Sequence, residues 1–220
     1  MEPLTLDHVA FWVADRRPLV ERCEKHLGMH VIDEQAEFSL VGTDARYGKF
    51  TFFDADGPRE PGALKHVGLR VSHLAAARAQ LPPDTGDCLE LGEGIRVRLV
   101  EAPTAVEYDL DHVAFCTPDP ERSAAAFERY GLQRASLGSV EVGGARLVFV
   151  HGEPEPTERP LLNHIGLLVE SADAHRRRAE SLGLEIEQVV DAANTYAVFL
   201  RGPDGIRIEY VEHKSTFALA

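Results

Sequence analysis

Two histidines and one glutamate in the second half of this 220-residue chain stand where they could share a metal ion. His112 and His164 each begin a short apolar stretch of the kind that forms a strand, and Glu209 lies in the last such stretch. Two imidazoles and one carboxylate suit Fe(II), and also Mn, Zn, Co or Ni. Such a ligand set would leave positions on the ion open for substrate, O2 or water.

The stretches that carry these residues are repeated along the chain. The hexapeptide at 6–11 returns letter for letter at 110–115, and related stretches stand at 64–69 and 162–167. Residues 94–101 likewise resemble residues 205–212. Repeats at a regular spacing indicate a duplicated architecture. We therefore predict two similar halves, each made of two similar modules.

Each module is predicted to be one strand, one helix and then two or three strands. Pro18 precedes a helical stretch that Gly28 ends, Asp119 and Pro120 resemble the start of another helix, and a third runs over about 172–182. The predicted fold class is α+β, with four βαβββ modules paired into two similar curved-sheet domains and helices outside. The predicted domains are 1–104 and 105–220, and the modules of each half are expected to share one sheet.

Side chains alternate between the two faces of a strand. The face that carries the four strand-opening histidines has Ala or Gly two residues after each, which leaves space beside the imidazole: His8, His66, His112 and His164. A four-residue loop at 202–205 would set Val198 opposite Glu209 and would put Tyr196 on the same face. A carboxylate buried on that face needs a cation or a strong donor, which supports a metal site at His112, His164 and Glu209.

The first half differs at one position of this pattern. His8 and His66 match the histidines of the second half, but Arg98 stands where the second half has Glu209. A guanidinium opposes a metal ion, and Arg70 and Arg96 would share its face. We expect no metal there. A vestigial site whose histidines only hydrogen-bond and an anion-binding or regulatory pocket both remain open.

Composition limits the classes of partner. The net charge is −13, which argues against binding to nucleic acid or to an anionic membrane surface. Three scattered cysteines form neither metal-binding pairs nor a disulfide framework, and no stretch resembles a signal peptide or a membrane span. These features predict a cytoplasmic protein.

The pattern of modules resembles the vicinal oxygen chelate superfamily, which includes glyoxalases, bleomycin resistance proteins and extradiol dioxygenases. The most specific motifs behind this resemblance are LDHVAF, LNHIGLLV and GPDGIRIEYVE. Because four modules stand in one chain with a complete ligand set in the second half, the chain is most similar to two-domain extradiol dioxygenases. The resemblance implies one divalent ion per chain, Fe(II) foremost, on His112, His164 and Glu209, with a catechol-like diol and O2 as substrates.

The resemblance also bears on proton transfer. Those dioxygenases resemble one another in an acid/base histidine near the start of a late strand of the third module, where this chain has Gly143-Gly144-Ala145. His151 is the nearby substitute, and Tyr196 is the second candidate catalytic residue. Three alternatives stay open: a non-redox glyoxalase-like lyase, an isomerase or epimerase, and a drug-binding resistance protein without chemistry. Each would act on a small molecule, and a homo-oligomer is compatible with all of them.

Overall fold

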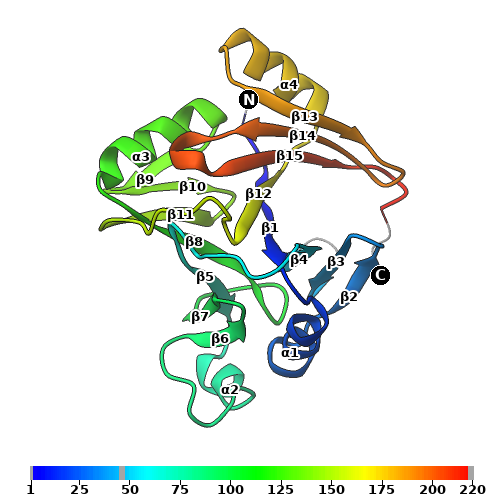
Figure 1. Ribbon diagram of the computed structural model, residues 1–220, viewed down its shortest axis with the longest axis vertical. Coiled ribbons are helices and arrows are strands. Elements are labelled where there is room, and N and C mark those ends of the chain that lie inside the picture. The colour runs from blue at the N-terminus through cyan, green and yellow to red at the C-terminus, as the bar shows by residue number, and fades with distance from the viewer. Residues whose placement is uncertain (1, 45–47, 218–220) are drawn as a thin grey trace.

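A computed structural model describes residues 2–44 and 48–217 of the chain. Its strands form two curved sheets, and the helices lie outside them (Figure 1). The expected fold class is confirmed. None of the helices in these described ranges is long and apolar enough to cross a lipid bilayer.

The eight-stranded sheet combines the first and fourth modules. Its strand order is β13-β14-β15-β12-β1-β4-β3-β2, and in that order the strands span Ile186–Asp191, Thr195–Arg201, Arg207–His213, Leu162–Leu168, Thr5–Val13, Lys49–Asp54, Phe38–Gly42 and His30–Glu34. At its centre β1 pairs with β12 in an antiparallel manner. Each module closes on itself by a parallel pair, β1 with β4 and β12 with β15.

The seven-stranded sheet combines the second and third modules. Its strand order is β6-β7-β5-β8-β11-β10-β9, and these strands span Leu89–Gly92, Ile95–Glu101, Leu64–Val71, Asp109–Thr117, Ala145–His151, Ser139–Val142 and Gln133–Ser136. The central pair here is β5 with β8. The second module is one strand shorter than the expected pattern, because the segment after its helix contains Pro82 and Pro83, which have no N–H to donate.

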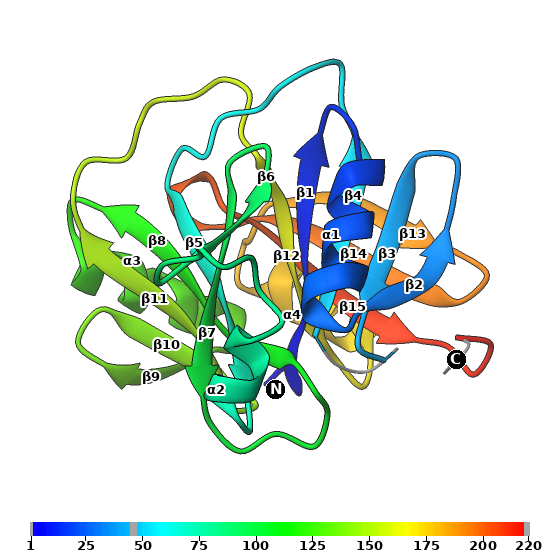
Figure 2. The ribbon, with the colours of Figure 1, turned by 90° about the horizontal axis from the view of Figure 1, so that it is seen from below.

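The sheets correct the expected pairing of modules. Each sheet takes one module from residues 1–104 and one from 105–220, so neither expected domain builds a sheet by itself. The short connection between Glu101 and Asp109 leads from β7 into β8 of the same sheet. The longer connections at 55–63 and 152–161 cross between the sheets side by side, with the Glu60 N–H donating to Arg159 O at 3.0 Å (Figure 2).

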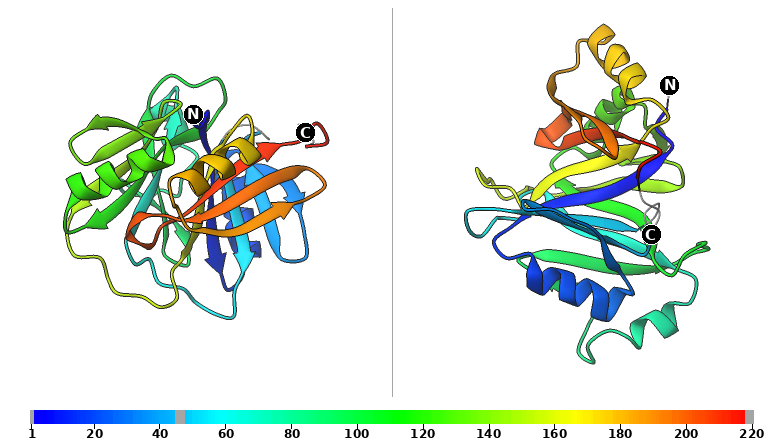
Figure 3. Two further views of the ribbon diagram at one scale, coloured as in Figure 1. Left: turned by 90° about the horizontal axis from the view of Figure 1, so that it is seen from above. Right: turned by 90° about the vertical axis from the view of Figure 1, so that its right-hand side faces the viewer.

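The helices cover the apolar outer faces of the strands. Helices α1, α2, α3 and α4 span Arg17–Leu27, Leu74–Arg78, Pro120–Phe127 and Ala172–Ser181. Helix α4 lies at one end of the molecule and helices α1 and α2 at the other (Figure 3). The predicted helix signals are confirmed: Gly28 ends α1 at φ 57°, and the Asp119 carboxylate accepts from the Arg122 N–H at 3.0 Å.

One apolar core joins both sheets and their helices. Val9, Phe11 and Val13 of β1 are fully buried in it, as the expected alternation of faces requires. The other face of β1 carries His8, which is thereby turned into the curve of the eight-stranded sheet. The pairing of modules therefore decides which histidines meet.

The module pairing can be tested by cross-linking. Thr5 and Leu168 are facing partners on β1 and β12, so the pair Thr5→Cys and Leu168→Cys is expected to form a disulfide under mild oxidation, detected by peptide mass spectrometry. Arg70 is the repeat-equivalent of Leu168 in the other sheet. Thr5→Cys with Arg70→Cys is the matched control, and a disulfide in that variant would contradict the sheet order.

Candidate metal centre

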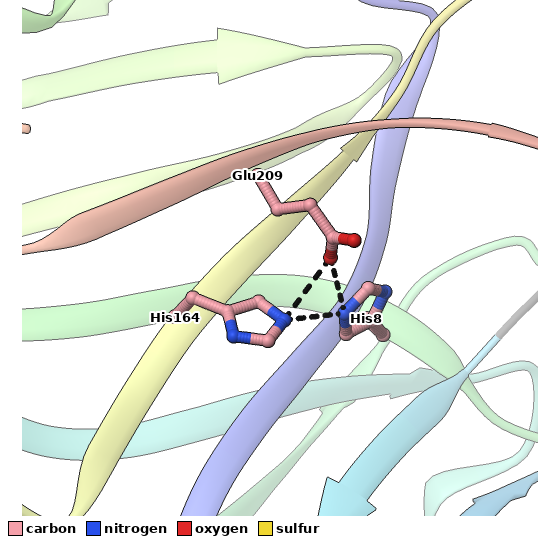
Figure 4. Close-up of side chains that lie close together, drawn as sticks. All are labelled: His8, His164 and Glu209. Atoms are coloured by element: carbon pink, nitrogen blue, oxygen red, sulfur yellow. Dashed lines mark hydrogen bonds and ion pairs between the residues drawn. The ribbon is translucent and has the colours of Figure 1, made fainter. Parts of the chain in front are cut away.

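Three potential ligand atoms meet inside the eight-stranded sheet. They are Nε2 of His8 on β1, Nε2 of His164 on β12 and an oxygen of Glu209 on β15, and all three residues are buried (Figure 4). The two nitrogens are 2.9 Å apart, and each lies 3.0 Å from Oε2 of Glu209. Three separate strands thus bring two imidazoles and one carboxylate into a nearly equilateral triangle.

The size of this triangle fits one face of an octahedral ion. Ligand bonds of about 2.1 Å at right angles place neighbouring ligand atoms about 3.0 Å apart, whereas tetrahedral angles would place them about 3.4 Å apart. The observed separations of 2.9 and 3.0 Å match the octahedral value. Three ligands on one face leave the opposite face open, as in the facial triads of non-haem Fe(II) oxygenases.

The hydrogen bonds around the triangle also favour a cation. Nδ1 of His8 donates to Oδ2 of Asp7 at 2.8 Å, and Nδ1 of His164 donates to Oδ1 of Asn163 at 2.9 Å. In neutral rings both Nε2 atoms then carry lone pairs. Oε2 of Glu209 is buried and makes no hydrogen bond of good geometry, although each of the two nitrogens lies 3.0 Å from it. Three lone pairs converging in a buried site require a positive charge.

Protonation supplies that charge when no ion does. Burial acts to lower the pKa of His8, but the charges of Glu209 and Asp7 outweigh it and raise the pKa to about 9. Burial lowers the pKa of His164. Burial acts to raise the pKa of Glu209, but the neighbouring histidines hold it far below its usual range. A metal ion would therefore displace a proton from His8, and its binding should strengthen as pH rises.

A glycine gives the His8 ring its place. Gly166 lies beside it, and a Cβ added there would come within 2.3 Å of the ring. The seven-stranded sheet has the same arrangement, with Gly68 beside the ring of His112 at the same 2.3 Å. The small residues that the sequence pattern singled out do leave space for imidazoles.

His112 does not join His164 and Glu209, which corrects the predicted ligand set. It lies on β8 in the other sheet, where its Nε2 is 2.9 Å from Nε2 of His66. The reason is the pairing of modules: β12 has β1 as its neighbour, so His8 takes the place expected for His112. His164 and Glu209 are brought together as expected.

The His66–His112 pair faces a cation instead of a carboxylate. Arg98 pairs with Gly68 as Glu209 pairs with Gly166, so Arg98 occupies the position of the third ligand. Burial, with the positive charges of His112 and Arg98, lowers the pKa of His66 to about 4. Among the described residues, only His8, His164 and Glu209 form a three-residue group suited to a metal ion.

Tyr196 lies away from the site, contrary to prediction. The turn between β14 and β15 has five residues, with Arg201 opposite Arg207, so Phe199 and not Val198 stands opposite Glu209. Tyr196 stands opposite Glu212 instead. A slip of one residue moves every side chain to the other face of a strand. Phe199 therefore lines the site, and Tyr196 packs against the core.

His151 is also placed elsewhere. It ends β11 in the seven-stranded sheet, is exposed, and its ring contacts the carbonyl of Pro118 through Nδ1 at 3.0 Å. The site has a different additional histidine, His213, which the sequence analysis did not single out. Its spacing could have revealed it, since residues 209, 211 and 213 share one face of β15.

The triangle opens into a cavity of about 360 Å³ inside the curve of the eight-stranded sheet. Much of its wall is aromatic: Trp12, Phe38, Phe53, Phe199 and Phe217. Its cations are already engaged, because Lys49 donates to Asp7 at 2.8 Å and Arg207 donates to Glu187 at 2.7 Å. The cavity suits a small, largely apolar ligand with a few polar atoms at the triangle.

A family of known proteins is similar to the second half of the chain. The family model of the Glyoxalase/Bleomycin resistance protein/Dioxygenase superfamily matches residues 109–210. A comparison with curated proteins finds no significant match.

Solved structures share the fold over nearly the whole chain. A protein of Bacillus subtilis provisionally described as a dioxygenase is 14% identical at a TM-score of 0.73, with 99% of this chain and 87% of that chain covered. Glyoxalase I from Zea mays is 15% identical at a TM-score of 0.69, with 94% and 92% covered. The cppA protein of Streptococcus pneumoniae is 14% identical at a TM-score of 0.63, with 96% and 98% covered.

Metal content should depend on the triangle and not on its neighbours. His8→Ala and Glu209→Ala are expected to remove a bound divalent ion, because two ligands hold it far less tightly than three. His112→Ala and Glu212→Ala should retain it, since Glu212 accepts from the Ala172 N–H on the other side of the sheet. Elemental analysis measures the metal content of the four variants. Loss of the ion in His112→Ala would refute the assignment of His8, His164 and Glu209 as its ligands.

The glycines provide a matched pair of substitutions. Gly166→Ala should displace the His8 ring and weaken ion binding at least tenfold, whereas Gly68→Ala should leave ion binding unchanged. Both should lower the free energy of unfolding by about 1–3 kcal/mol, because each adds a methyl group to a filled space. Calorimetric titration with the ion and denaturant unfolding measure the two effects. Equal ion affinity in both variants would show that the His8 ring does not hold the ion.

Proposed function

Because this chain belongs, through residues 109–210, to the Glyoxalase/Bleomycin resistance protein/Dioxygenase superfamily, we propose that it is a metal-dependent ring-cleaving dioxygenase of the extradiol type. Its substrate would be a small catechol-like vicinal diol, with O2 as co-substrate. The observation that carries the proposal is the buried triangle of His8, His164 and Glu209 at the end of an aromatic cavity.

These three residues would hold one divalent ion, and Fe(II) fits the proposal best. The ion would supply a redox-active Lewis acid with open positions for two adjacent oxygens and O2. The chain's own residues fix the ligands. The Asp7 carboxylate and the Asn163 amide oxygen hold each ring by its Nδ1–H, so that Nε2 faces the site.

Aromatic side chains shape the space in front of the triangle. The rings of Phe199 and Phe53 lie 5.1 and 6.0 Å from the ring of His164, centre to centre. The guanidinium of Arg207 lies over the Phe199 ring at 4.2 Å, which holds that ring in place. These walls would exclude water and bind a planar aromatic substrate.

One position argues against the lyase and isomerase alternatives. Ala10 pairs with Thr51 on β4 just as Gly166 pairs with Glu209 on β15, so Thr51 stands at the repeat-equivalent of the glutamate. A second carboxylate there could act as ligand and base, but a threonine hydroxyl is not a base at neutral pH. Binding without chemistry is disfavoured too, since a drug-binding protein gains nothing from burying a carboxylate between two imidazoles, which is costly.

Oxygen uptake tests the proposal. The Fe(II)-loaded protein is expected to consume O2 only when a catechol is added, and the Zn-loaded protein should consume none, because Zn is not redox active. His8→Ala should abolish uptake, and His112→Ala should keep it. Should the iron-loaded protein ignore a broad panel of catechols and yet isomerise or cleave a non-redox substrate with Ni, Co or Zn, the proposal fails.

A further inference from the structure

We propose that the seven-stranded sheet carries a second ligand site, in which Arg98 and the pair His66 and His112 bind the carboxylate of a small aliphatic acid. The site lies on β5, β7 and β8, whereas the triangle lies on β1, β12 and β15 of the other sheet (Figure 1). The inference goes beyond the proposed function and does not depend on it, because neither a metal ion nor a diol takes part.

The eight-stranded sheet shows how a carboxylate fits such a histidine pair. There the Nε2 atoms of His8 and His164 are 2.9 Å apart, and Oε2 of Glu209 lies 3.0 Å from each of them. The Nε2 atoms of His66 and His112 are also 2.9 Å apart, and the two rings cross at the same angle of 86°. A carboxylate oxygen can therefore face this second pair as Glu209 faces the first.

The chain places a cation at this point. Arg98 stands beside Gly68, where the other sheet has Glu209 beside Gly166. Arg98 is exposed, whereas Glu209 is buried, so the guanidinium is not enclosed between the rings. Within the described part of the chain, the Arg98 side chain has no hydrogen bond or ion pair. A guanidinium in this state can bind a carboxylate through two parallel N–H bonds.

Other arginines of this face already have partners. Arg96 lies 2.8 Å from the Glu90 carboxylate, and Arg146 lies 3.1 Å from that of Asp111. Arg70 lies 3.9 Å from the same Asp111 carboxylate and donates to two backbone carbonyls. The remaining arginine, beside the histidine pair, has no carboxylate partner in the described ranges. An acid from solution would provide one.

The hydrogens of the pair can also serve a bound carboxylate. Nδ1 of His112 donates to Oδ1 of Asp111 at 2.7 Å, just as Nδ1 of His8 donates to Asp7. In the neutral pair, Nε2 of His112 therefore accepts the N–H of His66. An oxygen that faces both Nε2 atoms needs a further N–H, which the pair gains by taking up one proton. We therefore expect binding of the acid to be coupled to proton uptake.

The surrounding charges set the direction of that coupling. Burial, together with the positive charges of His112 and Arg98, lowers the pKa of His66 to about 4. Although burial also acts to lower the pKa of His8, the charge of Glu209 helps to raise it to about 9. The charged groups around the second pair are Lys65 and Arg70 of β5, Glu90 of β6, Arg96 and Arg98 of β7, Asp109 and Asp111 of β8, and Arg146 of β11. A bound carboxylate would oppose the cations among them and favour the protonated pair, so its binding should strengthen as pH falls.

The side chains in front of the pair indicate the kind of acid. In the eight-stranded sheet, Trp12 and Phe53 are facing partners on β1 and β4. The equivalent partners on β8 and β11 are Cys116 and Val150, which are half-buried. Small and aliphatic groups thus replace the aromatic rings. They suit a short aliphatic chain better than a planar aromatic one.

The experiment titrates sodium propionate into the Zn-loaded full chain, labelled with ¹⁵N, and follows the ring nitrogens of the histidines by NMR. We expect saturable shifts at His66 and His112. Arg98→Gln should weaken binding about tenfold or more, because the bidentate contact is lost. The matched control Arg178→Gln, which removes the same charge from an exposed position on α4, should bind propionate as wild type does.

Two further probes test the chemistry of the ligand. Propionamide, which has the same shape without the charge, should cause no shift, and inorganic phosphate should bind more weakly than propionate. Between pH 8 and pH 6 the affinity for propionate should rise, by at most about tenfold per pH unit for one proton taken up. His66→Asn should bind more weakly and lose most of this pH dependence.

The outcomes are distinct from those of the oxygen-uptake test. No saturable shift below about 50 mM propionate would overturn the site. Equal affinity in wild type and Arg98→Gln would do the same, as would shifts confined to His164, which would place the acid at the zinc ion. Phosphate that binds more tightly than propionate would show a general anion site and refute the assignment of a carboxylate. None of these results bears on the proposed function.

Discussion

The negative charge of Glu209 is the constraint on which the centre of this molecule depends. A carboxylate that is 6% exposed is costly unless a positive charge compensates it. Two histidines lie 3.0 Å from it, and their other nitrogens are fixed by Asp7 and Asn163. Either a proton on His8 or a metal ion can supply the charge. The same arrangement explains why small residues, and not large ones, stand beside the rings.

The duplicated sheet shows what happens when that charge is removed. His66 and His112 keep the geometry of the first pair, with ring centres 5.1 Å apart against 5.0 Å and interplanar angles of 86° in both pairs. Arg98 replaces the glutamate, and His66 becomes a weak base with a pKa of about 4. One exchange between acid and base at equivalent positions thus separates a potential metal centre from a histidine pair that faces a cation.

Much of this could be read from the sequence, and the limits have physical causes. The repeat of LDHVAF predicted the modules, their helices and the histidine face, because periodicity and turn residues are local properties. The repeat could not show which strands are adjacent in a sheet, since four similar opening strands can pair in several ways. His112 was therefore predicted as a ligand in place of His8. Tyr196 was misplaced by a turn one residue longer than assumed. The contact between His213 and Asp7 joins β15 to β1. The sequence shows only that His213 shares a strand face with Glu209, and it does not show which residue of another strand lies opposite.

The central claim is that one divalent ion is held between modules from opposite ends of the chain. Anomalous diffraction from crystals of the Fe(II)-loaded protein, recorded on both sides of the iron edge, tests it most directly. The account predicts one peak per chain, about 2.1 Å from Nε2 of His8, Nε2 of His164 and an oxygen of Glu209. A peak beside His66 and His112, or a peak that contacts His164 without His8, would contradict it.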